Sequence, residues 1–179
     1  FYASRKLAIL SSIGFRANVT FDDVLVEGIE KIDKSDIQYA KDMGYTIKLL
    51  TVALRQENGI ALNVYPAFLP DNHPLSSVKG AYNAIYVTGN IVDDVMFYGR
   101  GAGALPTASA VMGDVISTAQ HILNGSTGTG MIMTDTKRIP FYSSLKLQNS
   151  YYFRLDVDDV TGVLSQIAAA FAENDISIC

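Results

Sequence analysis

The chain has 179 residues, 49% of them hydrophobic and 18% charged, which is enough to bury the core of one medium domain with a small module. Its net charge of −4, without a basic stripe, argues against a nucleic-acid partner, and no apolar run is long enough to cross a membrane. With one cysteine, Cys179, no internal disulfide can form, and a reducing, cytoplasmic location is indicated.

The first predicted element is a helix over residues 2–13, whose apolar positions leave little polar face and indicate a mostly buried helix. Lys6 lies inside this apolar stretch, and two interpretations of it stay open. The lysine can extend its ammonium group to water, as lysines on apolar surfaces usually do, or it can lie in a cleft and donate a proton or a hydrogen bond there. Because Phe1 is not an initiator methionine and the helix lacks an N-cap, we expect a fragment of a longer chain.

The middle of the chain predicts a helix followed by two hairpins. Ser35 with Gln38 has the spacing of a capping box, and Gly44 is typical of the position just beyond a helix end. Runs rich in β-branched and aromatic residues predict two pairs of strands: residues 45–54 and 60–65 joined at Asn58-Gly59, and residues 84–88 and 91–98 joined at Gly89-Asn90. With a third helix described below, they predict a mostly antiparallel α+β domain with helices on one face of the sheet.

The segment between the hairpins is predicted to be a loop, because it contains Pro66, Pro70 and Pro74. His73 beside Pro74 is more typical of a loop-anchoring hydrogen bond than of a catalyst. His121 belongs to the third helix and is expected at the surface or at an edge. The two histidines are too far apart in sequence, and have too few suitable neighbours, to predict a metal site.

A glycine-rich stretch, residues 99–103, joins the second hairpin to an apolar helix that is entered through Pro106. Glycines at alternate positions, Gly99, Gly101 and Gly103, remove the side chains that would keep a ligand from the backbone. The helix start adds unpaired N–H groups and a positive dipole end, which suit a polar or anionic ligand. A tight packing corner has the same pattern, and the spacing is not that of the dinucleotide fingerprint, so both interpretations stay open.

The last part of the chain predicts a linker and a second, smaller module. Residues 124–130 have the composition of a flexible linker. A strand over 151–157 and a helix over 160–172 follow, and Ser177-Ile178 indicate the start of another strand, which predicts a truncated βαβ-type module. We therefore expect a domain over residues 1–124, a linker over 125–149 and the small module over 150–179.

Three segments together resemble homoserine dehydrogenase. They are Ala3-Ser4-Arg5-Lys6-Leu7-Ala8-Ile9-Leu10, the run from Glu27-Gly28-Ile29 through Asp36-Ile37, Ala40 and Gly44-Tyr45 to Ile47-Lys48-Leu49-Leu50, and Gly99 to Val111 with Gly113-Asp114-Val115. His73-Pro74-Leu75 and Asn83-Ala84-Ile85 lie between them in the expected order. Each piece is weak alone, but the combination covers nearly all of residues 3–123 and is specific.

The resemblance implies an NAD(P)-dependent oxidoreductase that interconverts L-homoserine and L-aspartate 4-semialdehyde in threonine, methionine and isoleucine biosynthesis. It implies that Lys6 is the catalytic lysine, which exchanges a proton with the substrate oxygen, and that Gly103, Gly101 and Ala102 contact the cofactor. It also implies a homodimer, with residues 1–124 as the catalytic, substrate-binding and dimer-forming domain. The family's nucleotide-binding domain, which holds most of the NAD or NADP, is not in this sequence, so we expect the fragment alone to be inactive.

One departure from the family pattern concerns the substrate. Four residues before the lysine the family usually has an aspartate that helps to hold the substrate, whereas this chain has Tyr2. That spacing places both side chains on one face of a helix. Because tyrosine carries no negative charge at neutral pH, substrate binding is expected to differ.

The tail resembles the first half of an ACT domain, a small ligand-sensing module. Asp159-Val160-Thr161-Gly162-Val163-Leu164 resembles its first strand-to-helix turn, and residues 174–178 resemble the entry to its second strand. In this enzyme family such a tail implies feedback control, usually by threonine, although a truncated module is not expected to bind an effector normally. The alternative to an enzyme part is a non-catalytic dimerisation or amino-acid-sensing module.

Overall fold

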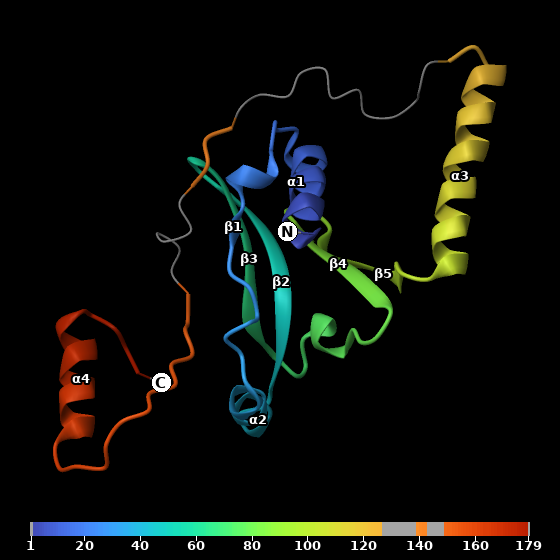
Figure 1. The fold of residues 1–179 in the computed structure, drawn as a ribbon. Coiled ribbons are helices and arrows are strands. Elements are labelled where there is room, and N and C mark those ends of the chain that lie inside the picture. The colour runs from blue at the N-terminus through green and yellow to red at the C-terminus, as the bar shows by residue number, and fades with distance from the viewer. Residues whose placement is uncertain (1, 127–138, 143–148, 179) are drawn as a thin grey trace. The chain divides into compact units, whose positions relative to one another are not determined.

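A computed structural model of the chain describes residues 2–126, 139–142 and 149–178 (Figure 1). The predictions made for Phe1, Cys179 and most of the glycine-rich linker therefore lie outside the described residues. The chain divides into two compact units, Phe1–Gln148 and Asn149–Cys179.

The described residues of the first unit form three α-helices, two 3₁₀ helices and five strands. In chain order they are α1 (Tyr2–Phe15), η1 (Phe21–Asp23), β1 (Leu25–Val26), α2 (Lys34–Asp42), β2 (Tyr45–Gln56), β3 (Gly59–Pro70), η2 (Pro74–Ser77), β4 (Tyr82–Gly89), β5 (Asp93–Arg100) and α3 (Ala104–Leu123). The strands form two sheets, one with the order β1-β3-β2 and one of β4 and β5. Among these described strands, β2–β3 and β4–β5 pair antiparallel and β1–β3 pairs parallel, so the predicted, mostly antiparallel α+β class is confirmed.

The β2–β3 hairpin is longer than the sequence predicted. It pairs without interruption from Gln56 opposite Gly59 to Tyr45 opposite Pro70, so Pro66 and Pro70 lie in a strand and not in the predicted loop. The turn is Glu57-Asn58 in place of the predicted Asn58-Gly59. Ile60 N–H donates to Pro140 O (3.0 Å) and Val64 O accepts from Glu27 N–H (2.7 Å), which shows that even-numbered residues of β3 face the edge away from β2. Pro66 faces this edge beyond the end of β1, so its missing N–H interrupts no ladder bond.

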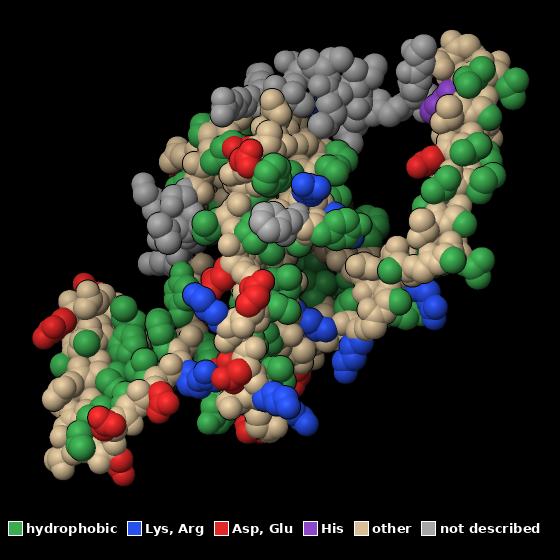
Figure 2. Space-filling view, in the orientation of Figure 1, with side chains coloured by type: hydrophobic (Ala, Val, Ile, Leu, Met, Phe, Trp, Pro, Cys, Tyr) green, Lys and Arg blue, Asp and Glu red, His purple; other side chains and the backbone are tan. Residues whose placement is uncertain are grey.

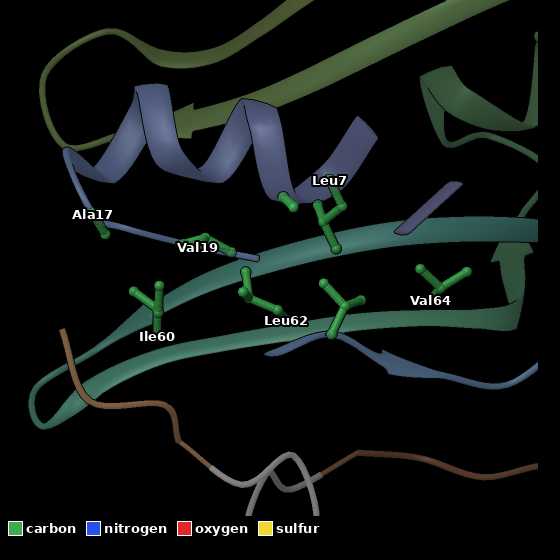
Figure 3. Close-up of a cluster of buried hydrophobic side chains, with 8 residues drawn as sticks. Leu7, Ala17, Val19, Ile60, Leu62 and Val64 are labelled. Atoms are coloured by element: carbon green, nitrogen blue, oxygen red, sulfur yellow. The ribbon is translucent and has the colours of Figure 1, made fainter. Parts of the chain in front are cut away.

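The core of the first unit lies between α1 and one face of the β2–β3 sheet (Figure 3). Alternate residues of β3, Ile60, Leu62 and Val64, pack against Leu7 and Ala8 of α1, because alternate side chains of a strand share a face. One stripe of α1 is buried, but Ile9 on the opposite face is 62% exposed. The prediction of a mostly buried helix is therefore wrong for the described chain, since the sheet covers one side of α1 only.

The N-cap of helix α2 is Asp33, two residues before the predicted cap. The Asp33 carboxylate accepts from the N–H groups of Ser35 (2.8 Å) and Asp36 (3.1 Å), and the Asp36 carboxylate accepts from Asp33 N–H (3.0 Å). Asp33 and Asp36 thus form the capping box that was predicted for Ser35 and Gln38. The predicted helix end is confirmed, because Gly44 follows the cap residue with φ +80°.

The second hairpin is confirmed, with a different turn. Gly89 pairs with Asp93, which leaves Asn90, Ile91 and Val92 in the turn, and Ile91 is 93% exposed. Ile91 and Val92 were predicted in the strand because they are β-branched. Asp93 adopts φ +52° at the end of the turn, a conformation that aspartate tolerates better than most residues.

Helix α3 follows β5 directly through residues 101–103. None of its side chains is buried in the described chain, and its apolar residues are visible along its length in Figure 2. Among the described residues, no helix is both long enough and apolar enough to span a membrane.

The second unit contains α4 (Val163–Glu173), which confirms the predicted helix. It starts later than predicted, after its N-cap residue Gly162, which has φ +93°. Residues 151–157 were predicted to form a strand, and this is wrong for the described chain, as it is for Ser177-Ile178. These residues pair with no described strand, and a strand is stable only through pairing. The aromatic rings of this segment instead pack locally, and the ring centres of Phe153 and of Phe171 on α4 are 5.5 Å apart.

Candidate functional site

Lys6 lies on the exposed side of α1. Its Nζ atom is 4.5 Å from the centre of the Tyr2 ring, one helical turn earlier. An ammonium group above an aromatic face is held there by the ring quadrupole, although the contact is weak at an exposed site. Tyr2 itself is 76% exposed, so both side chains are open to a ligand that approaches this face of α1.

The three alternate glycines of residues 99–103 differ in their surroundings. A Cβ on Gly99 would meet no atom within 4 Å. A Cβ on Gly101 would overlap the side-chain amide of Asn83. Gly103 has φ +122° and ψ 155°, a backbone conformation that belongs almost only to glycine. The open backbone predicted from the sequence is thus present at Gly99. At Gly101 the neighbouring Asn83 side chain requires a glycine, and at Gly103 the backbone conformation does.

The start of α3 has no side-chain cap. Gly103 is the N-cap residue, and its carbonyl accepts from Thr107 N–H at 3.1 Å, while Pro106 lies in the first turn. Gly103 has no side chain to cover the first N–H groups of the helix. A helix start of this kind presents N–H donors and the positive end of the dipole to an approaching polar group.

The strand that leads into this turn is held by stacked side chains. The rings of Tyr82 and Tyr98 lie 4.9 Å apart and within 2° of parallel. The Arg100 guanidinium lies 5.2 Å from the centre of the Tyr82 ring, and its Nε donates to Tyr82 Oη at 3.3 Å. Sequence reasoning did not identify this Tyr82–Tyr98–Arg100 ladder, although residues 98 and 100 share a face of β5 by the two-residue period of a strand.

His73 anchors its loop, as predicted. Its Nδ1 accepts from Leu75 N–H at 3.1 Å and so caps η2, and its ring lies 5.1 Å from the ring of Tyr86. Asp94 accepts from Thr88 Oγ1 at 2.7 Å. Among the described residues, no group of histidine, cysteine, aspartate and glutamate side chains is arranged to hold a metal ion.

The pKa of the Asp94 carboxylate is lowered. The largest cause is the hydrogen bond that Tyr86 donates to it, followed by the hydrogen bond from Thr88, and the charge of His73 adds a smaller contribution. The same hydrogen bond from Tyr86 to Asp94 raises the pKa of the Tyr86 hydroxyl. These hydrogen bonds lie within the second hairpin, and the ring contact of His73 with Tyr86 joins the hairpin to the His73 loop. The hydrogen bonds to Asp94 favour the charged form of its carboxylate.

Asp94 should therefore make the hairpin less stable in acid. Its contribution is present above the unfolded pKa of about 3.9 and is lost as the pH falls through the lower folded pKa. We expect Asp94→Asn to remove this part of the pH dependence of the urea midpoint, and Asp93→Asn, the matched control in the adjacent position, to retain it. Equal pH dependence in all three proteins would contradict this role.

The comparisons with known proteins bear on the same region. The family model described as homoserine dehydrogenase matches residues 1–116, which include Lys6 and the glycine-rich stretch. The chain belongs to the homoserine dehydrogenase family. Homoserine dehydrogenase of Bacillus subtilis is 39% identical over 175 residues, and that of Helicobacter pylori is 41% identical over 176 residues.

These matches cover 98% of this chain but only 40% and 41% of the two relatives. The chain thus spans about 40% of the length of these relatives. The solved structure of a homoserine dehydrogenase from Thiobacillus denitrificans matches 98% of the chain and 42% of its own length, with 34% identity and a TM-score of 0.86. At this identity the likeness supports a shared fold and a shared family.

The candidate site residues implied by the resemblance lie in two separate parts of the structure. Lys6 lies on α1, and Gly101, Ala102 and Gly103 join β5 to α3. No described hydrogen bond or ring contact joins Lys6 to residues 101–103. Their roles in substrate and cofactor binding therefore stay predictions.

Proposed function

We propose that this chain is the catalytic part of an NAD(P)-dependent homoserine dehydrogenase that interconverts L-homoserine and L-aspartate 4-semialdehyde. The observation that carries the proposal is the family match over residues 1–116, which contains both a lysine on an exposed helix face and an open glycine turn before a helix. Residues 1–124 would be the catalytic and dimer-forming domain, 125–149 the linker and 150–179 part of an ACT domain. The protein would work in the cytoplasm.

Lys6 is the proposed acid–base group. In the oxidation direction its neutral amine takes the proton of the substrate hydroxyl as the C–H bond gives up a hydride. In reduction its ammonium group returns that proton to the carbonyl oxygen and stabilises the developing alkoxide. The exposed position of the amine leaves it accessible to a substrate on this face of α1.

The turn of Gly101, Ala102 and Gly103 is the proposed contact with the cofactor. NAD(P)+, when bound, accepts the hydride. Two features support this contact: Gly103 has no side chain, and no side-chain hydrogen bond from it caps the start of α3. Other parts of the whole enzyme would hold the rest of the cofactor, so we propose that the 179-residue chain alone is inactive.

A homodimer is proposed as the working form. The edge of β2 away from β3 supports it, because odd-numbered residues of β2 direct their N–H and C=O groups to that edge and no described strand pairs with them. An open edge of this length is a template for pairing with another chain. A complete ACT domain in the whole enzyme would bind threonine as the effector.

The presence of Tyr2, where the family usually has an aspartate that helps to hold the substrate, favours the non-catalytic alternative.

We expect the whole enzyme to form NAD(P)H from homoserine and NAD(P)+, and the chain alone to form none. Restoring the carboxylate in Tyr2→Asp should lower the KM for homoserine about tenfold, since a hydrogen bond to a charged group contributes about 1.5 kcal/mol. If neither the whole enzyme nor its Tyr2→Asp variant forms NAD(P)H, the proposal of an enzyme is wrong, and a non-catalytic dimerisation or amino-acid-sensing module takes its place.

A further inference from the structure

We propose that Asn83 is a positioning residue for the cofactor turn and that it works as a pair with Gly101. The inference rests on the proposed function for the identity of the ligand, NAD(P). Asn83 lies on β4 and Gly101 follows β5, so the two residues meet because the second hairpin pairs its strands. The carboxamide of Asn83 occupies the space that a side chain on residue 101 would need.

Two hydrogen bonds bring this pair together. Gly101 N–H donates to Ala81 O at 3.4 Å, and Asn83 Nδ2 donates to the same carbonyl at 3.5 Å. Both bonds are long, so neither one alone fixes the turn. The carboxamide also lies against the Gly101 backbone, and this contact restricts the direction in which residues 101 and 102 leave the hairpin.

The contact with Asn83 explains why residue 101 is a glycine, and neither Gly99 nor Gly103 has a contact of this kind. At Gly99 a Cβ would meet nothing within 4 Å, and at Gly103 the nearest atom, Pro106 Cδ, would lie 3.4 Å away. A methyl group at Gly101 would instead displace the Asn83 carboxamide, which is the free end of a short side chain. Substituting either residue therefore removes the same contact, and the backbone N–H groups of the turn lose their alignment with the ligand.

The test is a double-mutant cycle in the whole enzyme, read by NADPH fluorescence as the cofactor Kd. We expect Asn83→Ala and Gly101→Ala each to raise the Kd about fivefold or more. The Kd of the double variant should be no higher than the higher of the two single-variant Kd values. Coupled residues give this non-additivity. In steady-state assays the KM for the cofactor should rise, while kcat at saturating cofactor stays within about twofold, because the proton-transferring group is not changed.

The matched control is Gly113→Ala on α3, where a Cβ also meets no atom within 4 Å and the Kd should not change. Urea unfolding of each variant separates loss of fold from loss of the contact. Additive effects, or a normal Kd for a folded Asn83→Ala, would overturn the pairing while leaving the proposed function intact. Absence of NADPH binding by the unsubstituted enzyme would overturn the proposed function and the cofactor role of Asn83 with it.

Discussion

Replacing Lys6 with alanine should lower the turnover of the whole enzyme by about a hundred- to ten-thousand-fold, the usual contribution of a general acid–base group. The binding of NADPH should change by less than about twofold, because Lys6 is assigned to the substrate oxygen and not to the cofactor. The measurement is kcat for homoserine oxidation beside the cofactor Kd. Near-normal turnover in Lys6→Ala would remove this lysine from the mechanism.

A second substitution separates proton transfer from charge. Lys6→Arg keeps a positive charge that can lie above the Tyr2 ring, but the guanidinium cannot give up its proton in the working pH range. We therefore expect Lys6→Arg to bind substrate better than Lys6→Ala and to turn over as slowly. Lys41→Ala, a substitution of an exposed lysine on α2, is the control and should keep full activity. Substantial turnover in Lys6→Arg would reassign the lysine to electrostatic stabilisation alone.

The elements that the sequence predicts well are those whose signals are local. Gly44 ends α2 because a residue with positive φ suits a helix end. Asn58-Gly59 predicts the first hairpin to within one residue, since the turn is Glu57-Asn58 and Gly59 already pairs with Gln56. The glycine-rich stretch is identified as a strand–turn–helix unit for the same reason. In each case the decisive atoms lie within a few residues of each other in the chain.

The failures need information from distant residues. Pro66 is tolerated in β3 because β1 has ended before it on the shared edge, and nothing near Pro66 in the sequence shows this. The exposed face of α1 and residues 151–157 contain apolar patterns that predict a buried helix and a strand, but the described chain covers one side of α1 and forms no strand over 151–157. The contact of Asn83 with Gly101 depends on the strand register, so the sequence predicts the glycine turn but not the residue that supports it.

Gly103→Val should reduce cofactor affinity by at least about tenfold while the fold persists. The residue has φ +122° and ψ 155°, and holding a non-glycine residue in such a region costs about 1–3 kcal/mol. Valine must therefore either strain the helix start or rotate it, and its side chain also covers N–H groups that the glycine leaves open. The turn is exposed, so few core contacts are lost. The measurements are the NADPH Kd of the whole enzyme and its urea midpoint.

Gly103→Ala tests how much the larger side chain adds, because alanine also places a Cβ at this disfavoured φ but lacks the two γ-methyl groups of valine. If the Cβ alone causes the strain, alanine loses most of the affinity that valine loses, and if the side chain excludes the ligand, alanine retains much more of it. Gly113→Val on α3 is the control for placing a β-branched residue in this helix, since a Cβ there meets no atom within 4 Å. An unchanged cofactor Kd in a folded Gly103→Val would mean that residues 101–103 form a packing corner and that the cofactor binds elsewhere. The packing interpretation of this stretch would then replace the ligand-binding one.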